Sequence, residues 1–139
     1  MASSNVTENL QLNQWQGADK PKMADFNSDN QKIDEAIGFI KGKGLPVIGS
    51  YPGDGNNTQE IELGFRPSFG IVFAIDQAIV RVQASNVVLF TAFIGPNGST
   101  LGVDLTDTGF SAVYLPQSMG GRMTYMNAAD IIYQYIVFR

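Results

Sequence analysis

Apolar residues recur at alternating steps of three and four between Pro21 and Ile40. This heptad spacing predicts an α-helix whose apolar stripe meets copies of itself. Proline is tolerated in the first turn of a helix, and Gly42 and Gly44 follow the last apolar position, so the sequence marks both ends of the element. The stripe positions, which we call the seam, are Met23, Phe26, Asn30, Ile33, Ile37 and Ile40.

The composition of the seam indicates how many chains it brings together. Isoleucine at both core positions favours three or four strands over two. Asn30 at its centre fixes register, because a shifted alignment would leave its amide unpaired. Asp29 and Asp34 oppose the arrangement, since they would face each other as like charges in a parallel bundle, and Phe39 lies off the seam. We predict a trimerisation neck over residues 21–44, with a single amphipathic helix lying on its own domain as the alternative.

Residues 1–20 are polar and rich in Asn and Gln, with isolated apolar positions at Leu10, Leu12 and Trp15. Such a segment cannot form a core alone. We predict a docking arm that uses these three side chains to bind a larger assembly. The alternative is a terminus in which Trp15 covers its own helix.

The remainder, residues 45–139, has the pattern of strands and turns. Thr58 to Leu63 alternates polar with apolar positions, and two long, mainly apolar runs follow, Phe69 to Ile75 and Val87 to Ile94. Gly, Pro, Asn and Asp punctuate the segments between them. We therefore predict a mainly β fold: an antiparallel β-sandwich head domain over 45–139, preceded by the coiled-coil helix.

The last run, Ile131 to Phe138, is apolar on both faces of a strand. Ile132, Ile136 and Phe138 point one way, and Tyr133, Tyr135 and Val137 the other. A domain of about a hundred residues has difficulty burying both sides of a strand, so we expect part of this surface to meet a neighbouring chain. Charged residues are 16% of the chain, below the roughly 25% of typical globular proteins, which supports the same conclusion.

Composition excludes several classes of function. The net charge is −4 and the basic residues are scattered singly, so no stripe exists for nucleic acid. Cysteine and histidine are absent, which removes thiolate sites, the commonest general base and the commonest metal ligand. We expect no catalysis, cofactor or metal site. No apolar stretch is long enough to cross a membrane and no secretory signal is present, so we expect folding in a cytoplasm.

Two chemical alternatives were weighed against this expectation. Glu60 and Glu62 lie two residues apart on one predicted strand face, within reach of retaining glycosidase geometry, but alternation with Thr58 is typical of a solvated face. The loops at 54–57 and 104–107 contain oxygen-bearing side chains of the kind that bind calcium, but their spacing matches no defined calcium-binding loop. Asp, Asn and Gly are also the residues that tight turns require, and we favour the turn.

An aromatic and polar group near the C-terminus suits a sugar, because carbohydrate is held by flat apolar faces and amide hydrogen bonds. The same residue types are enriched at subunit interfaces, which we favour slightly. The group comprises Tyr114, Gln117, Arg122, Tyr125 and Asn127.

Two parts of the chain resemble known protein segments. Leu12-Asn13-Gln14-Trp15 followed by Lys20 to Ala36, with DFNSDNQKID as its specific part, is similar to the N-terminal segment of tail proteins from phages and phage-like particles of Firmicutes. The later motifs resemble a module found at the end of such tail fibres. They are Ser50-Tyr51-Pro52-Gly53-Asp54-Gly55, Ile61-Glu62-Leu63-Gly64-Phe65-Arg66-Pro67, Thr108-Gly109-Phe110 and Tyr133-Gln134-Tyr135-Ile136-Val137-Phe138.

The resemblance implies a structural, non-enzymatic protein of a phage or tailocin tail, assembled in the bacterial cytoplasm. Its arm would attach to the baseplate or another tail protein, and its trimeric tip would contact carbohydrate or protein on the bacterial surface. The chain has no repeated shaft, so a short adaptor without receptor binding is the alternative. A surface-polysaccharide hydrolase is the less favoured one.

Overall fold

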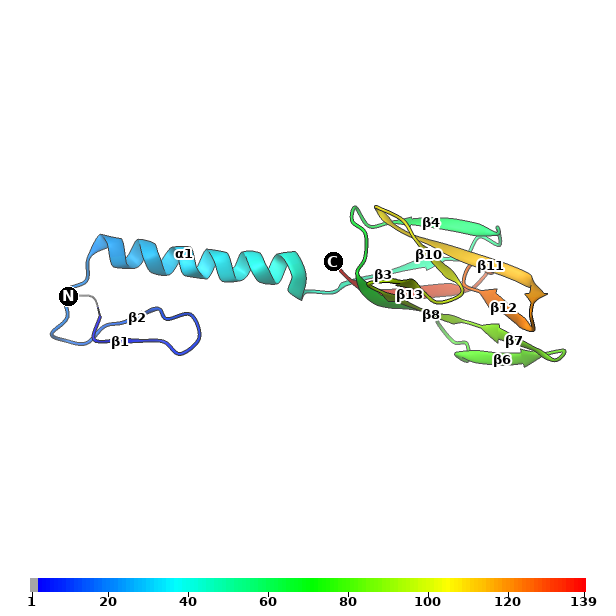
Figure 1. Cartoon of the computed structure of the whole chain (residues 1–139), viewed down its shortest axis with the longest axis horizontal. Helices are drawn as coiled ribbons and strands as arrows, with labels where there is room; N and C mark the ends of the chain where they lie inside the picture. The colour runs from blue at the N-terminus through cyan, green and yellow to red at the C-terminus, as the bar shows by residue number, and fades with distance from the viewer. Residues whose placement is uncertain (1–2) are drawn as a thin grey trace. The chain divides into compact units, whose positions relative to one another are not determined.

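The computed structural model describes residues 3–139, which divide into two compact units. The arm–helix unit runs to Leu45, and the head unit is Pro46–Arg139. The mainly β fold with one α-helix is confirmed for the described residues (Figure 1).

The arm–helix unit begins with a small hairpin of β1 (Asn5–Val6) and β2 (Asn13–Gln14), in which Asn5 pairs with Gln14. Helix α1 (Met23–Phe39) continues into a π-helical turn, η1 (Ile40–Gly44). The Asp25 carboxylate accepts a hydrogen bond from the main-chain N–H of Lys22 at 3.0 Å, which closes the first turn. At Leu45 the backbone becomes extended, so the glycine-rich end predicted from the sequence is where the helical segment stops.

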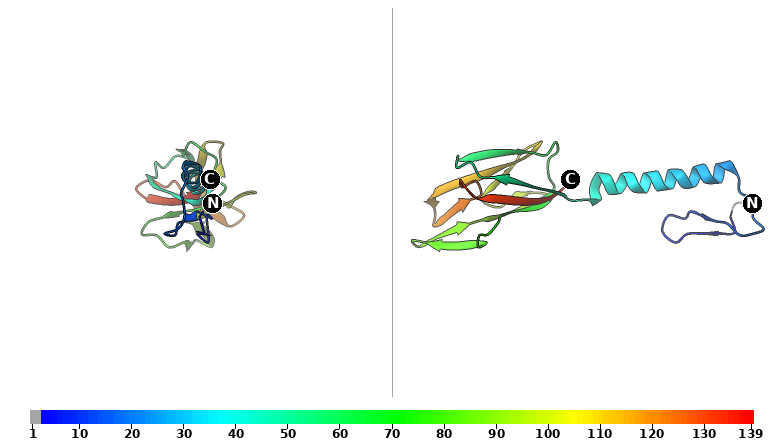
Figure 2. Two further views of the ribbon diagram at one scale, coloured as in Figure 1. Left: turned by 90° about the vertical axis from the view of Figure 1, so that its left-hand side faces the viewer. Right: turned by 180° about the vertical axis from the view of Figure 1, so that it is seen from behind.

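The head unit contains two sheets whose strands run broadly alongside one another (Figure 2). The first, which we call the β13 sheet, has the order β3 (Val47–Pro52), β13 (Ile132–Phe138), β5 (Phe69–Ala74), β8 (Thr91–Gly95) and β9 (Gly98–Ser99). The second, the β11 sheet, has the order β10 (Val103–Leu105), β11 (Gly109–Met119), β12 (Arg122–Tyr125), β7 (Asn86–Leu89) and β6 (Val80–Gln83), with β4 (Thr58–Glu62) also paired to β11.

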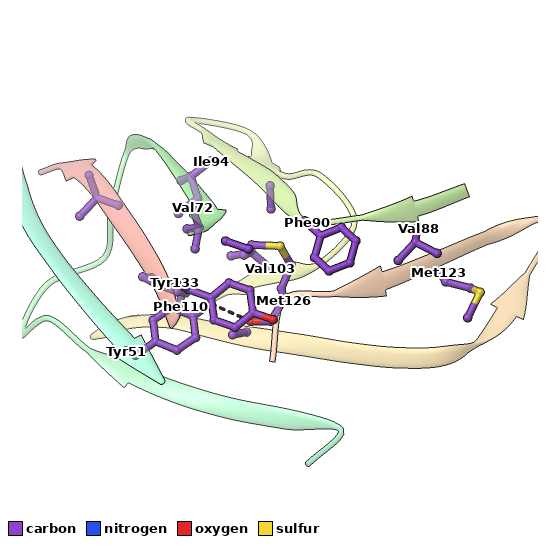
Figure 3. Packing of buried hydrophobic residues seen from close by; sticks show 14 residues of the cluster. Tyr51, Val72, Val88, Phe90, Ile94, Val103, Phe110, Met123, Met126 and Tyr133 are labelled. Atoms are coloured by element: carbon purple, nitrogen blue, oxygen red, sulfur yellow. Dashed lines mark hydrogen bonds between the residues drawn. The ribbon is translucent and has the colours of Figure 1, made fainter. Parts of the chain in front are cut away.

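One hydrophobic core joins the two sheets (Figure 3). Val72 and Val137 from the β13 sheet and Phe110 and Val88 from the β11 sheet are all fully buried in the same cluster. The prediction of wholly antiparallel sheets is wrong at one place, because β12 pairs with β7 in parallel.

The apolar run from Val87 to Ile94 is two strands in different sheets. The chain crosses between them at Phe90, which is buried; its main-chain N–H donates to the Ile79 carbonyl and its carbonyl accepts from the Ala74 N–H. The run is apolar except for the buried Thr91, because both sheets bury the crossing. Its length alone therefore gives no sign of the break.

Two stacked tyrosines fix the segment between β12 and β13. The rings of Tyr51 and Tyr133 lie 5.0 Å apart between centroids. The Tyr133 hydroxyl donates to the Tyr125 carbonyl at 2.6 Å and accepts the Ala128 N–H, while the Tyr51 hydroxyl donates to the Met126 carbonyl at 2.8 Å. Burial raises the pKa of Tyr133 to about 12 and raises that of Tyr51 as well, so both remain neutral donors at physiological pH.

Asn127, in the same segment between β12 and β13, holds that segment to the 54–57 loop. Its Nδ2 donates to the Asp54 carboxylate at 2.6 Å and to the Asn56 carbonyl at 3.0 Å, and its Oδ1 accepts the Asp54 N–H. The Asp54 carboxylate also accepts the Asn56 N–H at 2.8 Å, and these hydrogen bonds lower the pKa of Asp54. The 54–57 loop is thus a turn held by a buried amide, as favoured from its residue types.

Replacing Asn127 with Asp should strongly destabilise the head unit. The change removes two donors from a fully buried side chain and places a carboxylate against Asp54. We expect a loss of about 3–5 kcal/mol in the free energy of unfolding, measured by denaturant titration.

Asn97→Asp is the matched control, because Asn97 is exposed and the charge change is the same. The control should shift the free energy of unfolding by no more than about 0.5 kcal/mol. Equal losses in the two variants would contradict the role given to the Asn127 amide.

Candidate functional site

The seam of α1 is exposed along its whole length in the single chain. Its apolar side chains are between 37% exposed, at Ile33, and 80% exposed, at Met23, and Asn30 is exposed as well. No residue of α1 is buried, and Phe39, off the seam, is also largely exposed. The helix therefore carries an unpartnered apolar surface at the positions that the heptad pattern selects.

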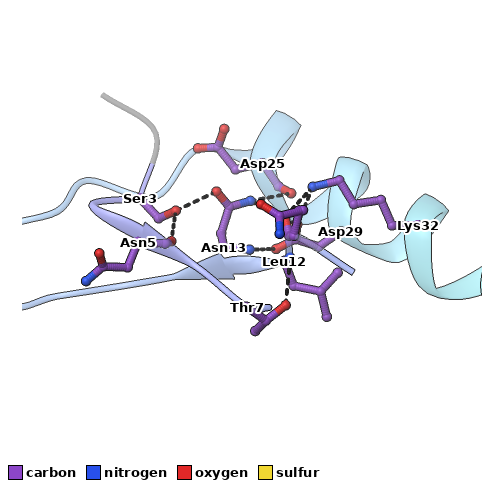
Figure 4. A network of polar contacts seen from close by, with 9 residues as sticks. Ser3, Asn5, Thr7, Leu12, Asn13, Asp25, Asp29 and Lys32 are labelled. Carbon is purple, nitrogen blue, oxygen red and sulfur yellow. Dashed lines mark hydrogen bonds and ion pairs between the residues drawn. The ribbon is translucent and has the colours of Figure 1, made fainter. Parts of the chain in front are cut away.

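The hairpin contacts a different, polar side of α1 (Figure 4). The half-buried helix residues are Asp25, Asp29, Lys32 and Ala36, which recur at helical spacing outside the seam. The main-chain N–H and the Nδ2 of Asn13 each donate to an Asp29 carboxylate oxygen at 3.0 Å. The Lys32 ammonium donates to the Gln11 carbonyl at 2.5 Å. The arm is thereby attached through polar contacts, and Phe26, which packs against Trp15, is the seam residue that it also contacts.

These contacts remove the electrostatic objection that the sequence raised against the neck. Partial desolvation of Asp29 opposes ionisation, but hydrogen bonds from Asn13 and the Lys32 charge, 3.7 Å away, outweigh it and lower the pKa of Asp29. The carboxylate is ionised and already satisfied within its own chain. It therefore presents less unpaired charge to a neighbouring Asp34.

The residues predicted for docking take different positions. Trp15 is half-buried, with its ring 5.7 Å from that of Phe26, so it covers its own helix as one of the two alternatives anticipated. Leu12 is half-buried and Leu10 is exposed near the tip of the hairpin. Ser4 ties the start of the hairpin to Asp19, and its hydroxyl is the main cause of the lowered pKa of Asp19.

Of the predicted ligand group, the structure brings the two tyrosines together. Tyr114 and Tyr125 are opposite each other on β11 and β12, with ring centroids 5.1 Å apart, and Tyr125 also packs edge-on against the core residue Phe90. Both are half-buried. Tyr125 packs against the core and Tyr114 packs on Tyr125, and neither β11 nor β12 is an edge strand of the sheet.

The polar members of that group separate. Arg122 is exposed and lines a hollow of about 470 Å³ together with Leu101, Met119 and Gly120. Gln117 lines a second hollow of about 250 Å³. Asn127 is fully buried and its amide is used internally, so it is not available at the surface. Arg122 and Gln117 are therefore the members of the predicted group that line hollows at the surface.

The acidic residues considered for chemistry lie in solvent. Glu60 and Glu62 are exposed on one face of β4, opposite Ser111 and Gly109 of β11. Asp107 is almost fully exposed, 3.6 Å from Arg66. A glycosidase acid needs an apolar surround, which neither glutamate has in this arrangement. Over residues 3–139, no three acidic side chains gather as they would around a metal ion.

The sequence did not single out the outer face of the whole β13 sheet. Ile48, Ile71 and Phe93 join Ile136 there, although only the last strand was recognised as apolar on both sides. The same signal is present in Phe69 to Ile75, which has apolar residues at both odd and even positions and therefore on both faces of a strand. Periodicity alone cannot distinguish a buried face of such a run from an uncovered one.

Comparison with known proteins adds no relative to these observations. In the described part of the chain, no helix has the length and apolarity needed to cross a membrane. Neither a protein-family model, nor a curated protein, nor a solved structure matches the chain.

Proposed function

We propose that this chain is an attachment protein in the tail of a phage or phage-like contractile particle. It acts as a homotrimer joined through the seam of α1, with its N-terminal arm directed to a baseplate or tail protein and its head unit to the bacterial surface. It works by binding and not by catalysis. The exposed seam is the observation that carries this proposal.

The energetic argument concerns the surface left on α1. Fully burying a large apolar side chain contributes about 1.5–3 kcal/mol. Five such side chains of the seam are more than a third exposed in the single chain, so covering them is worth several kcal/mol for each copy. Isoleucine at both core positions favours a trimer or tetramer, and a central Asn30 on each copy can satisfy its amide with its counterparts.

The resemblance to tail proteins supports the kind of assembly. The two resembling segments, Leu12 to Trp15 and Lys20 to Ala36, contact each other through Asn13 and Asp29 and through Trp15 and Phe26. The resembling residues thus form one local structure: a hairpin fastened to the first turns of a helix. This is consistent with an arm that is presented in a defined position for docking.

Replacing Ile33 with Asp should dissociate the oligomer. The substitution places a charge in the middle of the seam on every chain, and an unpaired buried charge costs about 3–5 kcal/mol. Light scattering should give about three times 15.1 kDa for the natural chain and 15.1 kDa for the variant.

Ser28→Asp serves as the control for this variant. Ser28 is exposed on the side of α1 away from the seam in heptad terms, so the added charge should leave the mass unchanged. An Ile33→Asp chain that keeps the mass of the natural oligomer would remove the neck from the proposal.

Deleting residues 1–20 should separate docking from oligomerisation. The arm contacts the polar side of α1 and, apart from Trp15 on Phe26, leaves the seam uncovered, so the shortened chain should keep the mass of the oligomer. It should no longer co-sediment with tail particles that lack their own copy of the protein. Loss of the oligomer on deletion would contradict the docking role of the arm.

A substitution at the hollow beside Arg122 distinguishes a receptor-binding tip from an adaptor. A receptor-binding tip should bind cells of particular strains from a Firmicutes panel, and Arg122→Ala should weaken that binding at least tenfold, equivalent to about 1.4 kcal/mol. Arg81→Ala is the control, because Arg81 belongs to β6 and lies outside that hollow. An adaptor would bind no strain and would instead retain a second tail component.

A further inference from the structure

A continuous apolar row crosses the outer face of the β13 sheet. The strand register places Ile48 of β3 opposite Ile136 of β13, Ile136 opposite Ile71 of β5, and Ile71 opposite Phe93 of β8. These four side chains therefore lie side by side across four neighbouring strands. Phe69 and Phe138, whose ring centroids are 6.1 Å apart, extend the face toward one end of the sheet.

This face differs from an ordinary solvated sheet face. Ile48 is 67% exposed and Phe93 is 53% exposed, and Phe69 and Ile132 are also more than half exposed. Together these four side chains present on the order of 400 Å² of apolar surface, which is comparable to the largest patch on a typical monomer, and such patches are often functional. Among the described outward-facing residues of β3, β13, β5 and β8, none is charged.

We infer that this face binds the same face region of further copies of the chain, so that the head units associate with one another as well as the helices. The inference deepens the proposed function and rests on it for the identity of the partner. A standard interface buries about 800 Å² on each partner. The half-exposed side chains Ile71, Phe73, Ile136 and Phe138 extend the patch toward that size.

The covalent path along the chain supports a second copy as the occupant. Gly44 ends η1 and Val47 begins β3, and the two residues between them allow three extended steps, which span at most about 11 Å. Copies that join through the seam must therefore bring the first residues of their β3 strands close together. Ile48 is the second residue of β3, and Phe138 and Phe69 belong to the same end of the sheet.

A single engineered cysteine tests this association directly, because the natural chain has none. Ser50 is exposed on the outer face of β3, and Glu60 is exposed on β4 of the other sheet. Treated with a short bismaleimide, full-length Ser50→Cys chains should couple into covalent dimers on a denaturing gel, whereas Glu60→Cys chains should remain single.

Charges on the row should abolish that coupling. Ile48→Asp and Phe93→Asp are each combined with Ser50→Cys, since both positions are more than half exposed and an aspartate there leaves the isolated head unit folded. Thermal unfolding verifies the fold of each variant. The inference is overturned if Ser50→Cys couples no better than Glu60→Cys, or if coupling survives both aspartates. It is equally overturned if the aspartates spare coupling and instead remove binding to bacterial surface polysaccharide.

The same cysteine separates this inference from the proposed neck. If Ile33→Asp keeps the oligomer and Ser50→Cys still couples, the neck fails and the sheet face is supported as the interface. If the natural chain is oligomeric, Ile33→Asp dissociates it and Ser50→Cys never couples, the neck is supported and the sheet face fails.

Discussion

An isolated helix of seventeen residues is only marginally stable in water, and most helical stability in proteins comes from packing an apolar stripe. Helix α1 buries none of its residues, and the hairpin beside it supplies mainly polar contacts. The hydrogen bonds between Asn13 and Asp29 orient the hairpin, but they do not remove apolar surface from water. Helix α1 therefore lacks, within the described residues of its own unit, the apolar packing that usually stabilises a helix, and the proposed association through the seam starts from this lack.

The head unit also leaves apolar side chains exposed to solvent, among them those on the outer face of the β13 sheet. Two facing sheets bury their inner faces against each other, and in a unit this small nothing remains to cover the outer ones. On β4 of the β11 sheet the outer positions include Glu60 and Glu62, which suit water. On the β13 sheet they include Ile48, Ile71 and Phe93, which do not. Exposed apolar side chains also occur on β6 of the β11 sheet, where Val82 is 73% exposed, so the β13 sheet differs in carrying its apolar side chains as a row across four neighbouring strands.

The helix and the β-rich fold could be predicted because periodicity reports burial within one element. The α1 segment, the alternation of β4 and the two-sided apolarity of β13 are all visible in the sequence. The crossing at Phe90 was not, since a run buried by two sheets looks like one buried by a single sheet. Nor was the burial of Asn127, because its partners Asp54 and Asn56 lie more than seventy residues away along the chain.

The two roles that we propose for α1, holding the hairpin and joining copies of the chain, account for the two kinds of residue in the segment that resembles tail proteins. Within DFNSDNQKID, Asp29 and Lys32 hold the hairpin through polar contacts, whereas Phe26 and Ile33 belong to the seam. Because the two sets occupy different sides of the helix, changes in one need not disturb the other. In the tail protein that we propose, changes to what the arm docks to would leave the association of the chains in place, except at Phe26, which belongs to the seam and also contacts Trp15 of the arm.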